Sequence, residues 1–431
     1  MWPRRSGPGF VSGSSMNYHF QKITTVYDVF LKQFLADTPF FFYELLPFQE
    51  LYDKFIGTWY SLSNFYARHM EGLGNEAQDL FASIEPMQKA WAREHNVNYT
   101  KENWLKEIVL AQISAFRPDV LYLQDLSLFD KGFREQIRQA YNHELFLIGW
   151  RGAPSGDFAS FEDLDLVLTS VPHFVQRLRN CGAKAELLTH GFEDSVLQVV
   201  KSNQKPDLDF IFAGTIGNSK GVHAQRYTLI EKLLNFSPLQ VWGHVNGPLP
   251  LPSQAHRQVY NAIYQTNNIL SRMGLSERQK ARIPLLRRGI DWEENPTLPT
   301  LDESYLGRIH PPVFGLEYYR LLARAKITLN VHADLAENYA GNMRLFEATG
   351  MGSCLITEWK RNLADLFEPE LEVVTYRSAE ECIEKVRYLL DHDEERQAIA
   401  AAGQKRTLRD HTFARRVRQL DELITPMLKK R

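Results

Sequence analysis

The chain has 431 residues, of which 44% are hydrophobic, 24% are charged and 12% are aromatic. At roughly 100–200 residues per domain, this length predicts two or three domains and excludes a peptide or a simple coiled coil. Lys and Arg number 50 against 52 Asp and Glu, a formal net charge of -2, so no overall positive field attracts nucleic acid, and an anionic ligand must be held by a local cluster.

The cysteine pattern favours a reducing compartment. Cys181, Cys354 and Cys382 are far apart in the sequence and lie outside CxxC or Cys/His spacing. This spacing argues against both a disulfide scaffold and a zinc site. We therefore expect a cytoplasmic protein.

The N-terminal region gives no sign of a membrane span. Residues 1–16 run through Gly, Ser and Pro without an apolar core of signal-peptide length, and we expect a disordered tail there. The most apolar stretch, 39–46, is interrupted by Glu44 and is far shorter than the roughly 20 residues of a span. It is typical of a core segment or a buried loop, with a membrane-touching patch as the alternative.

From there to about residue 200, short apolar runs alternate with amphipathic segments, the pattern of an α/β domain with a mostly parallel sheet. The expected strands are 23–27, 77–82, 119–124, 145–150, 164–169 and 185–189, and the expected helices lie around 47–71, 85–95, 101–116, 131–142 and 172–181. Thr100 is the expected cap of the third helix, and Ser170, before Pro172, is the expected cap of the last.

A polar, Pro-containing stretch at 200–207 marks a domain boundary, after which the alternation restarts. Strands are expected at 209–213, 239–243, 327–332, 353–357 and 371–376, and helices near 223–235, 315–325, 343–349, 378–390 and 394–409. Between 244 and 312 a Pro- and Arg-rich stretch with weak helical signals predicts an insertion near a cleft. The sequence thus predicts two doubly wound, Rossmann-like α/β domains, 17–204 and 205–408, that face each other across a cleft.

The strongest candidate for a binding site is the sequence NMRLFEATGMG, residues 342–352. It predicts a short helix whose first amides, beside Asn342 and Met343, attract phosphate oxygens. Arg344 falls in the first turn, and Glu347 can accept hydrogen bonds from a ribose diol. The alternative is an exposed Arg–Glu pair.

A second candidate is the glycine-rich turn at 212–221. The amides of Gly214 and Thr215 can approach a diphosphate there, and Lys220 and Arg226 can supply positive charge. The turn matches neither GxxxxGK[ST] nor GxGxxG, which disfavours a P-loop NTPase and a dinucleotide-binding oxidoreductase. An ordinary flexible connection explains such a turn equally well.

Polar residues at strand ends supply further candidates, because doubly wound sheets bind ligands at the carboxyl ends of their strands. His332 ends one expected strand and can reach a phosphate or a sugar hydroxyl; the alternative is a hydrogen-bonded core histidine. In the first half the corresponding residues are Gln124, Asp125, Arg151, Gly152, Asp157, Thr169, Ser170, His173, His190 and Gly191.

Two DxD strings, at 163–165 and 207–209, precede their strands, so we expect structural roles for them and not a metal site. GxSxG, HExxH and EF-hand patterns do not occur in the sequence, which disfavours a hydrolase.

Several segments carry a family resemblance. They are FYARHMEGLG, MQKAWAREH, FRPDVLYLQDL and DLVLTSVPHFVQRLRNCGAKAELLTHGFE in the first half, and FAGTIG, FGLEYYRLLARAKITLNVHAD, NMRLFEATGMGSCLITE and AAGQKRTLRDHTFARR in the second. From about residue 20 onward the chain resembles the CgeB-like group of bacterial GT-B glycosyltransferases, relatives of the group-1 transferases.

The resemblance implies a GT-B fold that takes a UDP-, GDP- or dTDP-sugar in the C-terminal domain and an acceptor in the N-terminal domain, without a bound metal. It implies that Glu347 binds the nucleotide ribose, that Lys220 and Arg226 assist the diphosphate, and that 409–431 crosses back onto the N-terminal domain. Tyr339 stands where group-1 transferases usually carry an earlier glutamate. The donor sugar and the stereochemical course therefore stay open.

We accordingly predict a metal-independent, retaining glycosyltransferase acting on a hydroxyl of a glycan, peptide or other cell-surface-type acceptor. Arg344, Asn342, Lys220 and Arg226 are assigned to the diphosphate and His332 to the phosphate or the sugar; an inverting enzyme would use Asp125 or Asp157 as its base. No nucleic acid or transmembrane span is expected, peripheral membrane contact is compatible with the sequence, and the oligomeric state is open. The alternatives are a sugar-nucleotide epimerase of the same architecture and a non-catalytic sugar-nucleotide or glycan-binding protein.

Overall fold

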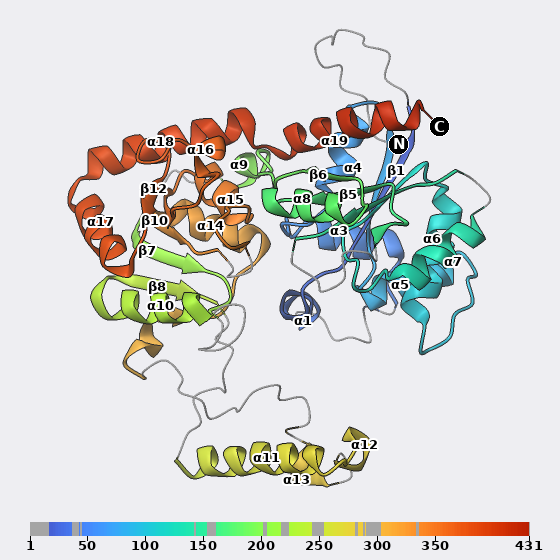
Figure 1. Ribbon diagram of the computed structural model, residues 1–431, viewed down its shortest axis with the longest axis horizontal. Coiled ribbons are helices and arrows are strands. Elements are labelled where there is room, and N and C mark those ends of the chain that lie inside the picture. Colours follow the sequence, from blue (N-terminus) through green and yellow to red (C-terminus); the bar gives the residue numbers. More distant parts are fainter. Residues whose placement is uncertain are drawn as a thin grey trace.

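The computed structural model describes residues 17–36, 43, 45–141, 144–152, 161–200, 205–216, 224–243, 254–280, 283–287, 289, 303–332 and 336–430. Within them the chain forms two six-stranded sheets in which all paired strands are parallel (Figure 1). The first sheet has the order β2-β1-β3-β4-β5-β6 and the second the order β12-β11-β10-β7-β8-β9.

The first sheet consists of β1 (His19–Thr24), β2 (Glu76–Phe81), β3 (Val120–Leu123), β4 (Phe146–Trp150), β5 (Leu166–Thr169) and β6 (Ala185–Leu187). Its helices are α1 (Asp28–Ala36), α3 (Phe48–Ile56), α4 (Phe65–Gly72), α5 (Glu85–Glu94), α6 (Trp104–Phe116), α7 (Lys131–Ala140) and α8 (Pro172–Asn180). The short α9 (Val196–Val199) follows and packs Val196 into a core of the second sheet. The run Val120–Leu123 is apolar throughout because successive side chains enter the cores on opposite faces of the sheet.

The second sheet consists of β7 (Leu208–Ala213), β8 (Leu239–Trp242), β9 (Ile309–His310), β10 (Ala325–Asn330), β11 (Cys354–Glu358) and β12 (Val374–Tyr376). Around it lie α10 (Ala224–Phe236), η2 (Glu303–Arg308), α14 (Gly315–Arg324), α15 (Arg344–Gly350), α16 (Leu363–Leu366), α17 (Ala379–Asp391) and α18 (Asp393–Asp410). β7 also alternates: Phe210 and Phe212 enter one core, and Ile211 and Ala213 enter the other.

Two segments connect the sheets and lie side by side. The amide of Phe192 donates to the His411 carbonyl at 2.8 Å, and the amide of Phe413 donates to the Phe192 carbonyl at 2.9 Å. Beyond this contact, α19 (Phe413–Leu428) packs Val417, Leu420 and Ile424 into a core of the first sheet. Figure 1 shows α18 and α19 following one another across both halves of the molecule.

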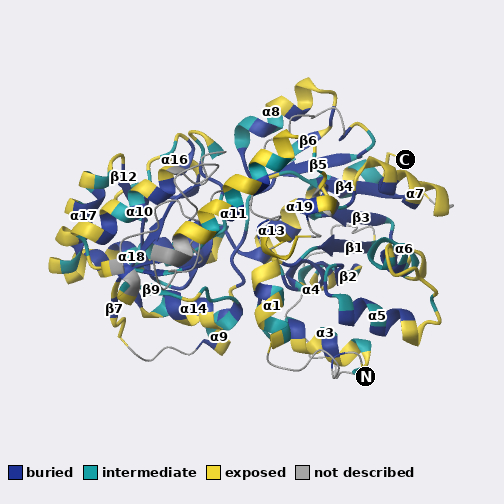
Figure 2. Ribbon diagram, turned by 90° about the horizontal axis from the view of Figure 1, so that it is seen from below, coloured by how far each residue is buried: buried dark blue, intermediate teal, exposed yellow. Residues whose placement is uncertain are grey.

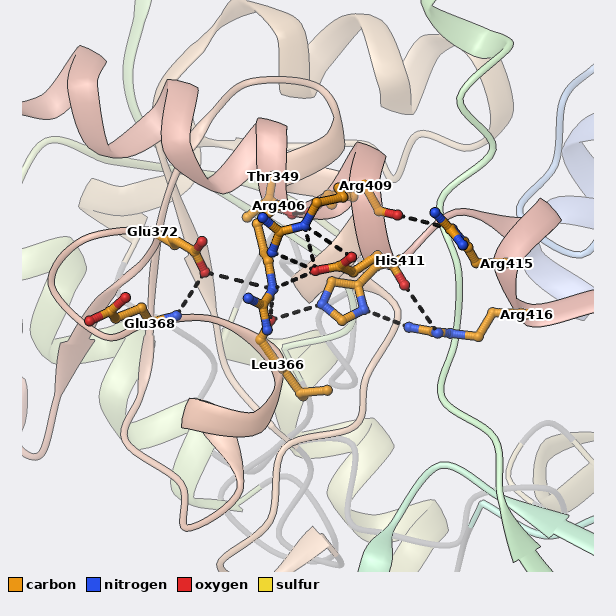
Figure 3. Close-up of polar contacts among 11 residues, drawn as sticks. Thr349, Leu366, Glu368, Glu372, Arg406, Arg409, His411, Arg415 and Arg416 are labelled. Atoms are coloured by element: carbon orange, nitrogen blue, oxygen red, sulfur yellow. Dashed lines mark hydrogen bonds and ion pairs between the residues drawn. The ribbon is translucent and has the colours of Figure 1, made fainter. Parts of the chain in front are cut away.

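Buried polar contacts fix this crossover (Figure 3). The His411 ring lies between the Leu366 carbonyl, 2.8 Å from Nε2, and the Arg416 guanidinium, 2.6 Å from Nδ1. Arg416 also donates to the His190 carbonyl in the other connecting segment. His411 and Arg416 therefore link the end of α18, the start of α19 and the segment that follows β6.

The region 244–312 is more helical than its sequence predicts. It contains the 19-residue α11 (Gln254–Arg272), followed by α12 (Glu277–Lys280) and α13 (Pro284–Arg287). These three helices, called the helical insertion below, lie together and apart from both sheets in Figure 1.

Three local predictions were wrong. The expected helix 47–71 is divided into α3 and α4, with Trp59 between them at φ 57. Thr100 does not cap α6, which begins after Asn103; the hydroxyl and amide of Thr100 donate to Glu107 instead. Ser170 does not cap α8, whose N-cap is Val171 and has no side-chain cap bond.

The described residues contain no helix with the length and apolar character of a bilayer span. The proposed disordered tail, 1–16, and residues 37–42 and 44 of the apolar stretch lie outside the described residues. Tyr43, within that stretch, is buried and donates its hydroxyl hydrogen to the Phe34 carbonyl at 2.8 Å.

Candidate active site

A cavity of about 450 Å³ lies between the two halves of the molecule. The first half lines it with Tyr27, Leu62, Gln124, Trp150, Gly152, Ser170, Val171 and His190, and the second with Arg226, His332, Ala336, Gly341, Asn342, Met343, Arg344 and Glu347. Gln124, Ser170 and His332 each closely follow the carboxyl end of a strand. The cavity thus occupies the position where doubly wound sheets bind ligands, and its size is typical of a small-molecule site.

Two arginines that line the cavity, from different elements, meet at the buried Phe212 ring. The Arg344 guanidinium carbon lies 4.7 Å from the centre of the Phe212 ring, and that of Arg226 lies 5.9 Å from it. Arg226, at the start of α10, is fixed by hydrogen bonds to the carbonyls of Thr215 and Val331. Phe212 lies near the carboxyl end of β7, so the strand brings both cations to one edge of the cavity.

Gly214 provides the space in which Arg344 lies. A Cβ atom at this position would come 2.3 Å from Nη2 of Arg344, and Gly214 has a positive φ of 148°. The glycine of the predicted turn therefore permits close approach of a side chain from α15.

Glu347 is buried at the cavity wall and already binds two hydroxyl groups. Ser61 from the first half donates to Oε1 at 2.7 Å, and Tyr318 of α14 donates to Oε2 at 3.1 Å. Burial raises the pKa of Glu347, although these hydrogen bonds and the charge of Arg344 act in the opposite direction. The contact with Ser61 joins the two halves directly across the cavity.

His332 and Asn342 are held by neighbours in the second half. The Asn342 side-chain amide donates to Oδ1 of Asn330 at 2.6 Å. Oε2 of Glu358 accepts from the His332 amide at 2.7 Å and lies 3.2 Å from Nδ1 of the same residue. Burial lowers the pKa of His332, which favours the neutral imidazole at pH 7 despite the nearby carboxylate.

Three buried polar atoms of the cavity residues have no hydrogen-bond partner among the described residues: Nε of Arg344, Nε2 of His332 and Oδ1 of Asn342. Buried polar atoms are normally paired, and leaving one unpaired costs about 1–3 kcal/mol. A polar ligand in the cavity can supply the missing partners.

Other predicted site residues lie elsewhere. The Asp125 carboxylate accepts from Thr25, Ser127 and Leu128 and does not line the cavity. Burial would raise the pKa of Asp125, but the hydrogen bonds from Ser127 and Thr25 outweigh this effect and lower it. Asp157 and Lys220 lie outside the described residues.

The four DxD carboxylates form ion pairs: Asp163 with Arg134, Asp165 with Arg138, Asp207 with Arg324 and Asp209 with Lys326. Tyr339, at the position of the missing glutamate, stacks on the His173 ring with centroids 4.8 Å apart.

Sequence reasoning missed Ser61, Tyr318 and Trp150. Ser61 is 286 residues from Glu347 in the sequence, and its surroundings match no motif. Trp150 is the last residue of β4, so the rule that strand ends face the cleft would have identified it as a candidate.

The chain resembles a known protein family and several solved structures. Residues 226–422 match a family model described as "Glycosyl transferase-like", while no curated protein is significantly similar in sequence. Sucrose-phosphate synthase (tll1590) from Thermosynechococcus elongatus superposes with a TM-score of 0.53 at 11% identity, over 96% of this chain and 100% of that one.

Two further structures are similar along their whole length. A glycosyltransferase from Rickettsia africae has a TM-score of 0.52 at 9% identity, covering 96% of this chain and 100% of its own. Anabaena HepE, solved in complex with UDP-glucose, has a TM-score of 0.52 at 10% identity, covering 95% of this chain and 100% of its own. The chain thus has a GT-B fold, and its second half matches the glycosyl transferase-like model.

Proposed function

We propose that this protein is a metal-independent, CgeB-like glycosyltransferase that moves a sugar from a nucleotide-diphosphate sugar to an acceptor hydroxyl. The observation that carries the proposal is the grouping of Arg226, Arg344 and Glu347 around one cavity at the carboxyl edges of both sheets. Two guanidinium groups suit a diphosphate, because each presents several N–H donors and a fixed charge.

The second half would bind the donor. Glu347 would accept hydrogen bonds from the ribose hydroxyls, in the way it accepts those of Ser61 and Tyr318. Arg344, Arg226, Asn342 and Lys220 would hold the diphosphate beside the turn at Gly214 and Thr215. His332 would donate to or accept from the phosphate or the sugar through its unpaired Nε2.

The acceptor would bind against the first half, where Trp150, Gln124 and Ser170 line the cavity. In the reaction, the bond between the anomeric carbon and the diphosphate oxygen breaks as the acceptor oxygen attacks that carbon. The arginines would stabilise the negative charge that develops on the leaving diphosphate.

We propose a retaining course, in which a leaving-phosphate oxygen takes the acceptor proton. This choice rests on the position of Asp125. Its carboxylate accepts hydrogen bonds in the turn after β3 and does not line the cavity, so it is poorly placed to act as a base. In an inverting reaction, Asp125 or Asp157 would take that proton instead.

The similarity to HepE favours UDP among the possible nucleotides, since that protein was solved with UDP-glucose. A thermal-shift screen of UDP-, GDP- and dTDP-sugars would identify the ligand. A ligand at 100 times its dissociation constant stabilises a fold by about 2.7 kcal/mol.

The test is the affinity of a Glu347→Gln variant for the ligand found in that screen. The substitution keeps the shape of the side chain but removes the carboxylate, and hydrogen bonds to a charged group contribute about 1.5–3 kcal/mol. We expect calorimetry to show an affinity about ten- to a hundredfold lower.

Glu317→Gln is the matched control, because Glu317 is an exposed glutamate of α14. Wild-type affinity in a folded Glu347→Gln variant would contradict the ribose assignment. Hydrolysis of the donor without any requirement for an acceptor would contradict the proposed transferase activity.

A further inference from the structure

The helical insertion combines an excess of positive charge with exposed apolar side chains. Between Gln254 and Gly289 the sequence contains seven Lys and Arg residues and a single Glu, although the whole chain has a net charge of -2. The rest of the molecule is therefore acidic, and the positive charge is concentrated in this segment.

The exposed surface of α11 carries an apolar stripe. Val259, Ile269 and Met273, just beyond its end, have relative exposures of 46%, 54% and 69%. At 3.6 residues per turn these three positions fall within an arc of about 80° on the helix surface. Ala262 and Thr266 lie in the same arc, so the stripe contains no charged residue.

The side of α11 next to this stripe is already covered. Ile263 and Asn267 are buried, and the Asn267 side-chain amide donates to the carbonyl of Leu286 in α13 at 3.0 Å. Leu286 is buried while its neighbours Leu285 and Ile283 are exposed. Packing inside the insertion therefore leaves the apolar stripe of α11 to solvent, and Figure 2 shows exposed residues along this helix.

Exposed basic side chains accompany the stripe. Arg272, at the end of α11, and Arg287, at the end of α13, are both exposed. Lys280 is buried and donates to the Ser271 hydroxyl at 2.8 Å, so it stabilises the insertion itself.

We propose that the helical insertion is a docking surface for anionic lipid bilayers, with α11 lying in the plane of the membrane. An apolar stripe combined with Lys and Arg is the pattern of helices that bury one face at the headgroup boundary while their cations contact lipid phosphates. A second copy of this surface fits less well, because self-association would bring like charges together. A nucleic acid would leave the apolar stripe unused.

This inference does not depend on the proposed transferase activity, because it concerns residues outside the cavity. It assigns the insertion a role in holding the protein at a membrane surface.

The experiment measures co-sedimentation of the full chain with vesicles of equimolar phosphatidylcholine and phosphatidylglycerol and with phosphatidylcholine alone. We expect binding to the anionic vesicles and at least about tenfold weaker binding to the neutral ones. Raising the salt from about 0.1 M to about 1 M should release most of the protein, since the screening length falls from about 10 Å to about 3 Å.

The variant Ile269→Asp/Met273→Asp should lower binding to the anionic vesicles at least about tenfold, because it places charge in the apolar stripe. Leu371→Asp/Leu408→Asp is the control: it makes the same change in net charge at two other exposed leucines and should bind as the wild type does. Circular dichroism verifies that both variants are folded.

Three results would overturn the proposal: a wild-type protein that does not bind the anionic vesicles, an Ile269/Met273 variant that binds them normally, and equal loss of binding in the control. Light scattering on the free proteins could give a fourth result against the proposal. A dimer that the Ile269/Met273 variant abolishes, without vesicle binding by the wild type, would show that the stripe contacts a second copy of the chain.

Discussion

Gly214 determines where the guanidinium group of Arg344 can lie. The group stacks over Phe212 and donates to Oδ1 of Asn330 at 3.4 Å, in a space that a side chain at position 214 would fill. The positive charge at the edge of the cavity thus depends on the absence of a Cβ atom two residues after Phe212.

Gly214→Ala should therefore weaken donor binding. The new methyl group would displace Arg344, and the strain of alanine at a positive φ would add about 1 kcal/mol to the destabilisation. We expect the affinity measured by calorimetry to fall about tenfold, corresponding to the loss of roughly one charge-assisted hydrogen bond.

Gly274→Ala is the matched control for this variant. Gly274 has a φ of +87°, but a Cβ atom there would have no neighbour within 4 Å. Equal affinities of the two variants would show that the position of Arg344 is unimportant for the donor.

The polar residues of the cavity could be predicted from the sequence because each belongs to a local pattern. Arg344 and Glu347 share one helix start, and His332 follows an apolar run. The hydroxyl partners of Glu347 were not accessible: nothing near Ser61 or Tyr318 distinguishes them from other surface or core residues. Their role arises from the fold, which brings them to the same carboxylate.

At the scale of elements, buried parallel strands could be predicted because they are apolar on both faces. The expected runs 119–124 and 145–150 contain β3 and β4. Helix starts were less predictable. The amide and the hydroxyl of Thr100 both donate to the Glu107 carboxylate, so Thr100 does not cap α6. The length of α11 was not predicted, because Gln and Asn separate the apolar residues along its sequence.

The crossover between α18 and α19 should respond to acid. Burial lowers the pKa of His411 from 6.5 to about 4, and the ring accepts a hydrogen bond from Arg416. Protonation would remove that acceptor and place a second positive charge beside the guanidinium. Between pH 6.5 and pH 4 the unfolded chain consequently binds more protons than the folded one.

The contribution of His411 to stability is therefore fully present above pH 6.5 and is lost as the pH falls toward 4. The lowered pKa corresponds to about 3 kcal/mol. Urea unfolding at several pH values should show this fall in the wild type. The fall should be smaller in His411→Gln, which keeps a donor and an acceptor but does not titrate. Identical pH profiles would disprove the role of His411, since His190 would contribute equally to both proteins.

At the scale of the whole molecule, the two halves are held by contacts between residues far apart in the sequence. The Leu316 amide donates to the Thr58 carbonyl at 2.9 Å, and Phe314 packs against Phe30 with ring centroids 5.3 Å apart. Thr58 lies close in sequence to Ser61, which binds Glu347 at the cavity wall. Sequence periodicity predicts each sheet separately. The docking of one half on the other depends on contacts between residues far apart in the sequence, which periodicity does not reveal.

Gly315→Ala should loosen this docking. Gly315 has a φ of +57°, and a Cβ atom there would lie 2.0 Å from the Thr58 carbonyl oxygen, so the first half must move away. We expect an increased radius of gyration in small-angle scattering and a loss of about 1–3 kcal/mol of stability, the usual cost of overpacking. Gly182→Ala is the control that distinguishes a loss of docking from backbone strain. Gly182 also has a positive φ of +86°, but a Cβ atom there would have no neighbour within 4 Å. If both variants kept the wild-type radius and were equally destabilised, strain alone would explain the effect and the contact between Thr58 and Gly315 would not hold the two halves together.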